Sequence, residues 1–325
     1  MRHLLFLALP TMMALQLSFC AAAIRPTTYP LDAPPASLWV APADLSDRDA
    51  FHGPWGAERA PDPQARYSLV QRKHSGINPG MTVRDPLGRE WSIKQAGAES
   101  PDEGPVEVAL SRILSTVGYH QPPVYYLPSF TLEDDWGTRV ESGGRFRLKL
   151  KTLKDRGEWS WQQNPFVGTR PLNGLLVIMM MFNNSDIKNS NNTLYEHRSD
   201  NGIEHWYVAR DLGGSLGTTG RLAPLKNDPD AFARHPFVLG IENGYVAFHY
   251  RGWHQELVRE RITAADLAWA SCLLDRLSDR HWQDAFRAGG YAPDVAQRFI
   301  RTLEDKIAVG QRLGSMPEWT PYERD

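Results

Sequence analysis

The sequence DIKNSN at residues 186–191, followed by RDLGG at residues 210–214, is the stretch that decides which fold and chemistry to expect. An acid, a lysine two positions later and an amide five positions later precede a second acid that stands directly before a leucine and two glycines. Carboxylate and amide oxygens are ligands that Mg²⁺ accepts, and a lysine can neutralise phosphoryl charge. The two motifs together predict a site that holds a magnesium–nucleotide complex and presents an acceptor to it.

The two motifs flank a predicted hairpin and follow a predicted helix. Apolar residues recur at helical spacing over residues 171–182, while residues 193–195 and 205–209 have the pattern of two short strands. This arrangement places the two acidic motifs at the ends of one hairpin. A structural alternative stays open, because NNSD at residues 183–186 is a turn-forming sequence that can simply cap the hairpin.

Upstream, the sequence predicts a hairpin that ends in Lys94. Residues 81–84 and 89–94 are strand-like and enclose the turn-forming sequence DPLG. Phosphoryl transfer needs a lysine on the nucleotide phosphates and a carboxylate that orients this lysine. Glu107 is the expected partner, because it lies on the helix predicted over residues 105–118, and that helix can pack behind the sheet.

Two other features lie close to this lysine in the sequence. Glu99 and Glu103 compete with the helical glutamate for the lysine, although both lie in the loop before the helix. The segment SGINPG at residues 75–80 contains Gly76 and Gly80, and we expect its backbone to cover the phosphates. Taken alone, a lysine at the end of a strand is usually a solvated surface residue.

The remaining pattern predicts an α+β chain in which strands come first and helices later. Further strands are expected at residues 124–130 and 145–150, and residues 217–236 are expected to be irregular. Further helices are expected at residues 264–278, 281–288 and 293–313. We therefore divide the globular part into a sheet-containing unit over residues 66–152 and a mainly helical unit over residues 153–325.

The N-terminus is predicted to be a signal peptide spanning residues 1–23. A basic start precedes an apolar run, and CAAA at residues 20–23 offers the small residues that a signal peptidase requires. The mature chain would be exported to the periplasm or secreted. A lipoprotein site at Cys20 is an alternative that the bulky Phe19 disfavours. Residues 24–65 are rich in Pro, Asp and Ala and are expected to form an extended leader on the surface.

Composition limits the remaining possibilities. With 325 residues and 42% hydrophobic content, the chain can bury a sizeable core. A net charge of −2, with scattered Lys and Arg, gives no indication of a nucleic-acid partner. The apolar run at residues 172–182 is too short to span a bilayer, so no transmembrane span is expected in the mature chain. Cleavage after Ala23 would leave Cys272 alone, which excludes an internal disulfide.

In the order of these motifs, residues 75–217 resemble the protein-kinase-like superfamily, and within it the atypical persistence-toxin, secretory-pathway and spore-coat kinases. The chain is also similar to exported bacterial proteins that share a lysine at the end of a strand, an Asn-x-Asp-x-Lys-x-x-Asn loop and an Asp-Leu-Gly turn. The resemblance implies a two-lobed α+β fold, with a small N-terminal sheet lobe carrying one helix and a larger, mainly α C-terminal lobe. The chain departs from ordinary kinases at Asn184-Ser185, which replaces His-Arg, and it lacks a full Gly-x-Gly-x-x-Gly loop.

The resemblance also implies roles for single residues. Asp186 would accept or orient the acceptor's hydroxyl proton, and Lys188 would neutralise the transferred phosphoryl group. Asn191 and Asp211 would bind the metal of ATP complexed with Mg²⁺ or Mn²⁺. Lys94, oriented by its glutamate, would hold the nucleotide phosphates.

Three functional hypotheses follow from the sequence. The first is an exported kinase-like phosphotransferase that moves the γ-phosphoryl group of ATP to an unknown protein, peptide, sugar or small-molecule hydroxyl. The second keeps the fold but transfers a nucleotidyl group from a nucleotide bound in the reverse direction. The third is a non-catalytic kinase-like binding module. Retention of Lys, two Asp and Asn at the motif positions favours an enzyme over the third hypothesis.

Overall fold

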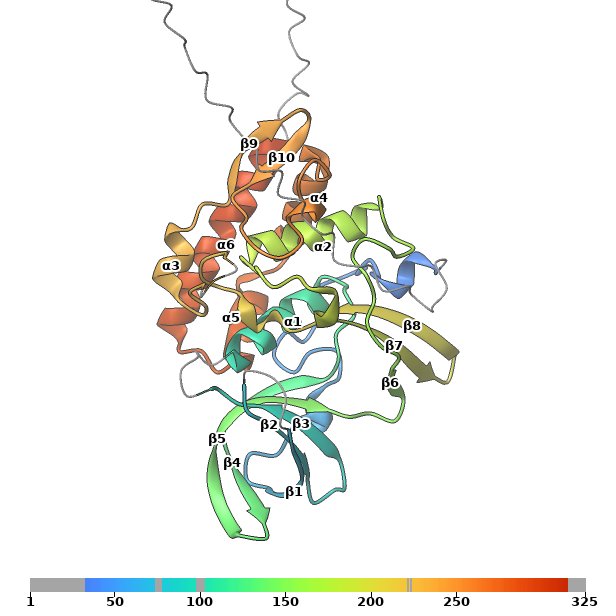
Figure 1. The fold of residues 1–325 in the computed structure, drawn as a ribbon, viewed down its shortest axis with the longest axis vertical. Coiled ribbons are helices and arrows are strands. Elements are labelled where there is room, and N and C mark those ends of the chain that lie inside the picture. The colour runs from blue at the N-terminus through green and yellow to red at the C-terminus, as the bar shows by residue number, and fades with distance from the viewer. Residues whose placement is uncertain (1–32, 74–77, 98–102, 221, 223, 315–325) are drawn as a thin grey trace, which may run out of the picture.

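The computed structural model describes most of the chain as a mixed α+β structure, with a closed β-barrel beside a larger helical part (Figure 1). The described stretches are residues 33–73, 78–97, 103–220, 222 and 224–314. The predicted signal peptide, Cys20 and Gly76 lie outside them. No helix in the described stretches combines the length and apolarity that a membrane span requires.

The barrel contains the first five strands in the spatial order β1-β2-β3-β5-β4. Their bounds are β1 (Arg66–Lys73), β2 (Gly80–Arg84), β3 (Glu90–Lys94), β4 (Val124–Asp134) and β5 (Gly137–Leu148). Parallel pairing of β1 with β4 closes the barrel, and the other neighbouring strands pair antiparallel. The predicted β2–β3 hairpin is confirmed, whereas the β4–β5 hairpin extends far beyond the two strand segments that were predicted.

The two faces of the barrel wall have different chemistry. Because side chains alternate along a strand, Ile93 of β3 and its partner Phe146 of β5 point into the barrel and are completely buried. The neighbouring pair, Lys94 and Arg145, lies on the opposite face, where both side chains contact acids from outside the barrel. The polar face of β2, β3 and β5 is therefore the one that meets the rest of the molecule.

Within the described residues, six α-helices build the larger part. Their bounds are α1 (Gly104–Thr116), α2 (Arg170–Met181), α3 (Pro229–Arg234), α4 (Ala264–Asp275), α5 (Asp279–Ala288) and α6 (Pro293–Gly314). In Figure 1, α1 lies between the barrel and the other helices. Its apolar side chains, such as Leu110 and Leu114, are completely buried in the helical core rather than in the barrel core. The resemblance placed this helix in the sheet lobe, but its packing ties it to the helices.

Two smaller sheets complete the regular structure. Their strands are β6 (Leu153–Asp155), β7 (Asn192–Ser199), β8 (Gly202–Ala209), β9 (Val238–Glu242) and β10 (Tyr245–Phe248). The predicted hairpin between the two acidic motifs is confirmed as β7–β8, and β6 pairs along its β7 edge. Short 3-10 turns lie at Pro35–Ser37, Ala57–Arg59, Asn189–Asn191, Leu212–Gly214 and Gln255–Leu257.

The segment predicted as a surface leader is in part a component of the core. Of its described residues, Leu38, Leu45 and Ala50 are at most 5% exposed. The Trp39 indole also donates a hydrogen bond of 2.8 Å to the Val117 carbonyl at the end of α1. Proline and short turns interrupt any regular period in this segment, so the sequence does not indicate the burial of its scattered apolar residues.

The segment predicted to be irregular, residues 217–236, contains the short helix α3. Asp228 caps its first turn by accepting a hydrogen bond of 2.8 Å from the Ala231 amide, and Pro229 occupies the first helical position. Phe232 anchors the helix in the core with 0% exposure. The cap and the proline are local signals that could have predicted this helix.

Candidate functional site

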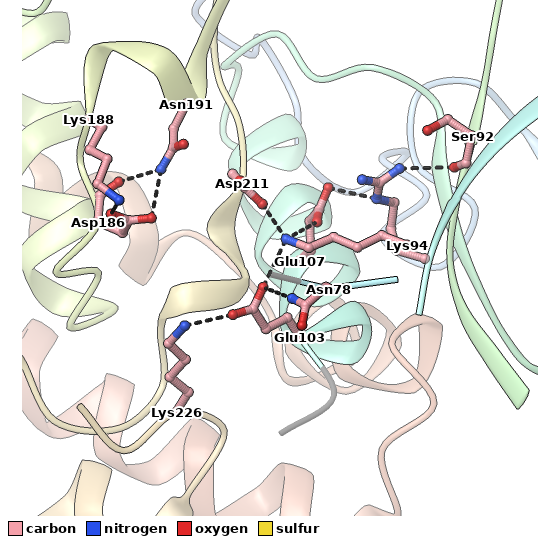
Figure 2. Close-up of polar contacts among 11 residues, drawn as sticks. Asn78, Ser92, Lys94, Glu103, Glu107, Asp186, Lys188, Asn191, Asp211 and Lys226 are labelled. Atoms are coloured by element: carbon pink, nitrogen blue, oxygen red, sulfur yellow. Dashed lines mark hydrogen bonds and ion pairs between the residues drawn. The ribbon is translucent and has the colours of Figure 1, made fainter. Parts of the chain in front are cut away.

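Lys94 lies among acids contributed by separate parts of the fold (Figure 2). Its Nζ atom is 2.6 Å from Asp211 Oδ1, 2.8 Å from Glu103 Oε2 and 3.9 Å from Glu107 Oε2. Lys94 ends β3, the two glutamates lie just before and within the first turn of α1, and Asp211 follows β8. The predicted lysine and the predicted second acid, 117 positions apart, therefore meet directly.

Two glutamates, Glu103 and Glu107, face Lys94, whereas the sequence favoured Glu107 as the partner of this lysine. Glu103 is the nearer, and its other oxygen accepts from Lys226 Nζ at 2.7 Å. Glu107 is farther from the lysine, and its Oε1 lies 2.9 Å from Arg145 Nε. Its Oε2 is buried without a hydrogen-bond partner among the described residues. Lys94 can therefore move closer to Glu107 if a ligand replaces Lys94 as the partner of Asp211.

Charge in this group is balanced, since three carboxylates face three cations. They are Glu103, Glu107 and Asp211 against Lys94, Arg145 and Lys226. Burial lowers the pKa of Lys94, but Glu107, Asp211 and Glu103 raise it by more, so the net pKa lies above the ordinary value. Burial likewise raises the pKa of Asp211 and of Glu103. The contacts with Lys94 and their other partners lower both pKa values by more, so each net pKa lies below its ordinary value.

The turn after β8 explains why Asp211 is followed by leucine and glycines. Asp211 has φ 57° and ψ 47°, a left-handed conformation that Asp tolerates better than most residues. The chain then approaches the start of α1 closely. A Cβ atom placed on Gly213 would lie 2.5 Å from Glu103 Cβ, which is a clash. Glycine at this position lets the turn bring Asp211 beside the glutamates.

The DIKNSN motif at residues 186–191 forms another group, which is more exposed than the one around Lys94. Lys188 Nζ lies 2.6 Å from Asp186 Oδ1, and the Asn191 amide donates hydrogen bonds of 2.6 Å to the Asp186 carbonyl and 3.1 Å to its Oδ2. Lys188 also lies over the Trp253 ring, 4.9 Å from its centroid. The side chains of Asp186 and Lys188 are 35% and 37% exposed, so a ligand in solution can reach both.

The β7–β8 hairpin places the two groups side by side. Asn192, the first residue of β7, pairs with Ala209, the last residue of β8. The Arg210 amide then donates a hydrogen bond of 3.0 Å to the Asn191 carbonyl, so Asn191 and Asp211 follow the same end of the hairpin. Within the described residues, no hydrogen bond or ion pair joins the side chains of one group to those of the other, as Figure 2 shows.

The donor atoms at this end of the hairpin fit a magnesium–nucleotide complex. Asp211 offers a carboxylate whose side chain is 44% exposed. Asn191 is held through its amide nitrogen, which leaves its carbonyl oxygen without a hydrogen bond from the described residues. Mg²⁺ prefers such oxygen ligands and is commonly held by one or two protein groups together with phosphates and water. Described His, Cys, Asp and Glu residues form no cluster of three that would hold a metal by themselves.

Other residues near the site show what sequence reasoning could and could not find. Gly80 begins β2 and pairs with Lys94, so it lies beside the lysine as the sequence suggested. Asn78 Nδ2 donates a hydrogen bond of 2.9 Å to Glu103 Oε2. The sequence predicted neither Asn78 nor Lys226 as a site residue. Lys226 lies 123 positions from Glu103, and no local pattern marks it. Two surface cavities, of about 200 and 300 Å³, lie elsewhere, beside β10 and around α2.

Comparison with known proteins gives a distant similarity in structure. No protein-family model and no curated protein sequence matches the chain. Among solved structures, the chain is similar to a Helicobacter pylori proinflammatory kinase, CtkA, with a TM-score of 0.45 and 9% sequence identity. The similarity covers 78% of this chain and 98% of that one. At this distance it assigns neither an activity nor a residue role to the chain.

Proposed function

We propose that the chain is a kinase-like phosphotransferase that uses ATP with Mg²⁺ or Mn²⁺ to phosphorylate a hydroxyl acceptor. The observation that carries the proposal is the end of the β7–β8 hairpin, where Asn191 and Asp211 lie together and Lys94 of the barrel bonds Asp211 directly. An amine, two metal-binding oxygens and a solvent-accessible acid are the groups that positioning and charge stabilisation of a phosphoryl group require.

Each residue has a defined task in this proposal. Lys94 binds phosphate oxygens, held in place by Glu103 and Glu107, while Asp211 and Asn191 hold the metal. The bound metal neutralises phosphate charge. Asp186 accepts the proton of the attacking hydroxyl as the acceptor oxygen bonds to the γ-phosphorus and the bond from that phosphorus to the leaving ADP oxygen breaks. Lys188, 2.6 Å from Asp186, offsets negative charge on the transferred group.

The direct contact between Lys94 and Asp211 requires an exchange of partners on binding. Lys94 would leave Asp211 to bind phosphate oxygens, and the freed Asp211 carboxylate would then hold the metal. Glu107 keeps the lysine close, because its Oε2, which accepts no hydrogen bond from the described residues, is 3.9 Å from Nζ. Binding therefore replaces one ion pair by two charge-assisted contacts rather than leaving a buried charge alone.

Labelled ATP tests the proposal. The full chain is incubated with γ-labelled or α-labelled ATP and Mg²⁺ or Mn²⁺, and label on the chain, on added hydroxyl acceptors and as free phosphate is measured. Transfer of γ-label that Asp186→Asn abolishes supports phosphotransfer, and transfer of α-label indicates nucleotidyl transfer instead. A thermal-shift titration runs in parallel, because ligand at a hundredfold its Kd adds about 2.7 kcal/mol of stability. No label transfer together with no thermal shift would overturn the proposal and favour a binding role for another ligand.

We also propose that the mature chain begins after residue 23 and acts outside the cytoplasm, from the sequence of its N-terminus. Expression of the full chain in a bacterium, followed by fractionation and N-terminal sequencing, tests this. A product in the periplasm or medium that begins at residue 24 is expected. An uncleaved chain in the cytoplasm would contradict it.

A further inference from the structure

Two cations with few counter-charges, Lys73 and Arg147, lie beside the Lys94 group on the same face of the barrel, and a third, Arg210, approaches from the β7–β8 hairpin. Ser92 and Arg147 are paired across β3 and β5, and the next pair on this face is Lys94 and Arg145. Arg147 is therefore two strand positions, roughly 7 Å, from the Lys94 pair. The Lys73 side chain reaches the Ser92–Arg147 pair, because its Nζ donates a hydrogen bond of 2.8 Å to Ser92 Oγ.

Gly80 makes the position of Lys73 possible. Lys73 pairs with Gly80, and Gly80 pairs with Lys94, so the Lys73 side chain lies across β2. A Cβ atom on Gly80 would lie 3.2 Å from Lys73 Cδ, closer than most real contacts. The absence of a side chain at Gly80 thus leaves room for a second ammonium group to cross towards Ser92.

Arg210 completes the group from the opposite side. It follows β8, and its Nη1 donates a hydrogen bond of 2.8 Å to Tyr195 Oη. Its one acidic contact among the described residues is Asp155, at 3.8 Å and with a side chain 56% exposed. We call Lys73, Arg147 and Arg210 the basic cluster. Arg147 makes no ion pair and no side-chain hydrogen bond with any described residue.

The mutual influence of these cations agrees with their closeness. Burial lowers the pKa of Lys73 to about 8, with further lowering by Arg147, Arg145 and Arg210 among its neighbours. Burial lowers the pKa of Arg147 to about 10, with further lowering by Arg145 and Arg210. Glu107 is the nearby acid that opposes the effect on Arg147, but its Oε1 is already bonded to Arg145. Like charges held together in partly buried positions destabilise a protein unless an anion joins them.

We propose that the basic cluster is a phosphate-binding subsite. Arginine and lysine together supply the forked and the point-like donors that phosphate oxygens accept. The subsite rests on the proposed function in one respect, because its phosphate belongs to a ligand of the same site. That phosphate comes from the phosphate chain of the nucleotide itself or from a phosphorylated acceptor bound beside it.

Calorimetric titration with inorganic pyrophosphate, without metal, tests the subsite directly. The full chain is compared with Arg147→Gln, with Lys73→Gln and with the matched control Arg72→Gln. Arg72 is the next residue on β1, carries the same charge and has its closest acid, Asp134, at 3.5 Å on β4. We expect pyrophosphate affinity to fall about tenfold in each cluster variant and to change little in the control. Circular dichroism confirms that the variants are folded.

Titration with magnesium–ATP then separates the two sources of the phosphate. If the nucleotide supplies it, ATP affinity falls in the same two variants as pyrophosphate affinity. If a phosphorylated acceptor supplies it, ATP affinity is unchanged and pyrophosphate still binds in the presence of saturating ATP. Wild type that does not bind pyrophosphate, or equal losses in Arg72→Gln and the cluster variants, would overturn the subsite. Failure of the proposed function is a different result, because pyrophosphate binding can persist when no label is transferred from ATP.

Discussion

The Lys94 group and the Asp186 group lie at the same end of one hairpin, yet they differ in how the protein holds them. Lys94 has three acidic neighbours, and those acids have further cations of their own. Asp186 and Lys188 are paired mainly with each other and are about one-third exposed. The first group connects the barrel to the helices, whereas the second is carried by a single loop.

This difference teaches how the two groups can divide the work. A side chain that links two parts of the fold contributes to stability as well as to binding, because its removal leaves other buried charges unpaired. A side chain on a solvent-facing loop contributes little to stability and is free to serve the reaction. We therefore expect substitutions in the first group to change unfolding and binding together, and substitutions of Asp186 and Lys188 to change the rate alone.

The largest effect is expected from Asp186→Asn. The change removes the proton acceptor but preserves the shape of the side chain, so the rate of phosphoryl transfer is expected to fall about 100- to 10,000-fold. Nucleotide affinity and melting temperature are expected to stay near the wild-type values. Asp211→Asn is the matched comparison, and it is expected to weaken metal-dependent ATP binding instead. Single-turnover rates and ATP titrations measure both, and equal loss of ATP affinity in the two variants would break the proposed division.

The next largest effect is expected from Lys94→Met. Asp211 would lose its closest cation and Glu103 one of its two lysine partners, so the free energy of unfolding is expected to fall by about 1–3 kcal/mol. This is less than for a fully buried pair, because the Asp211 side chain is 44% exposed. Urea denaturation measures the loss. Lys226→Met serves as the control, since it removes one partner of Glu103 and leaves Lys94 in place; an equal loss there would show that Lys94 is not the central cation.

A smaller effect on the free energy of unfolding is expected when the pH is lowered. The pKa values of Glu103 and Asp211 lie below their ordinary values in the folded chain, so their stabilisation is present above about pH 4 and is lost as the pH falls through the folded values. The stability difference between wild type and Glu103→Gln is therefore expected to be constant between about pH 6 and 8 and to shrink below about pH 4. Urea denaturation at several pH values measures it. A stability difference that grows towards acid pH would mean that the pKa of Glu103 is raised in the folded chain and not lowered.

The smallest effect on stability is expected from Lys188→Met. Its pair with Asp186 is exposed on both sides, and such pairs contribute less than about 1 kcal/mol. The free energy of unfolding is expected to remain within that limit, while the transfer rate falls. Denaturation and rate measurements on the same preparation check this. A loss of stability as large as that of Lys94→Met would remove the contrast between the two groups.

The sequence predicted the parts of the site that depend on local spacing. Asp186, Lys188 and Asn191 lie within six consecutive residues, and Asp211 is marked by Gly213, which its turn requires. The approach of Glu103, Lys226 and Arg147 depends on how distant segments pack, and no local pattern records that. The choice between Glu103 and Glu107 could not be made for the same reason, since it depends on where the turn at Gly213 meets α1.

The fold was predictable where one face of an element is apolar. The helices α5 and α6 and the hairpin β2–β3 show such a face, and the structure has them near the predicted positions. In β1 a single residue, Tyr67, is buried, so its pattern resembles a loop. The first half of β5 is exposed or half-buried on both faces, which concealed the length of the β4–β5 hairpin.

Closure of the barrel by β1 and β4 has a consequence for how other chains can approach. Each of its five strands has a neighbour on both sides, so no barrel strand is unpaired along its whole length, although β5 pairs with β3 only at residues 145–148 and its first half pairs with β4 alone. In the described stretches, the small sheets do have outer strands, namely β6, β8, β9 and β10. A protein acceptor that binds by strand addition would dock there, and β8 leads directly into Asp211.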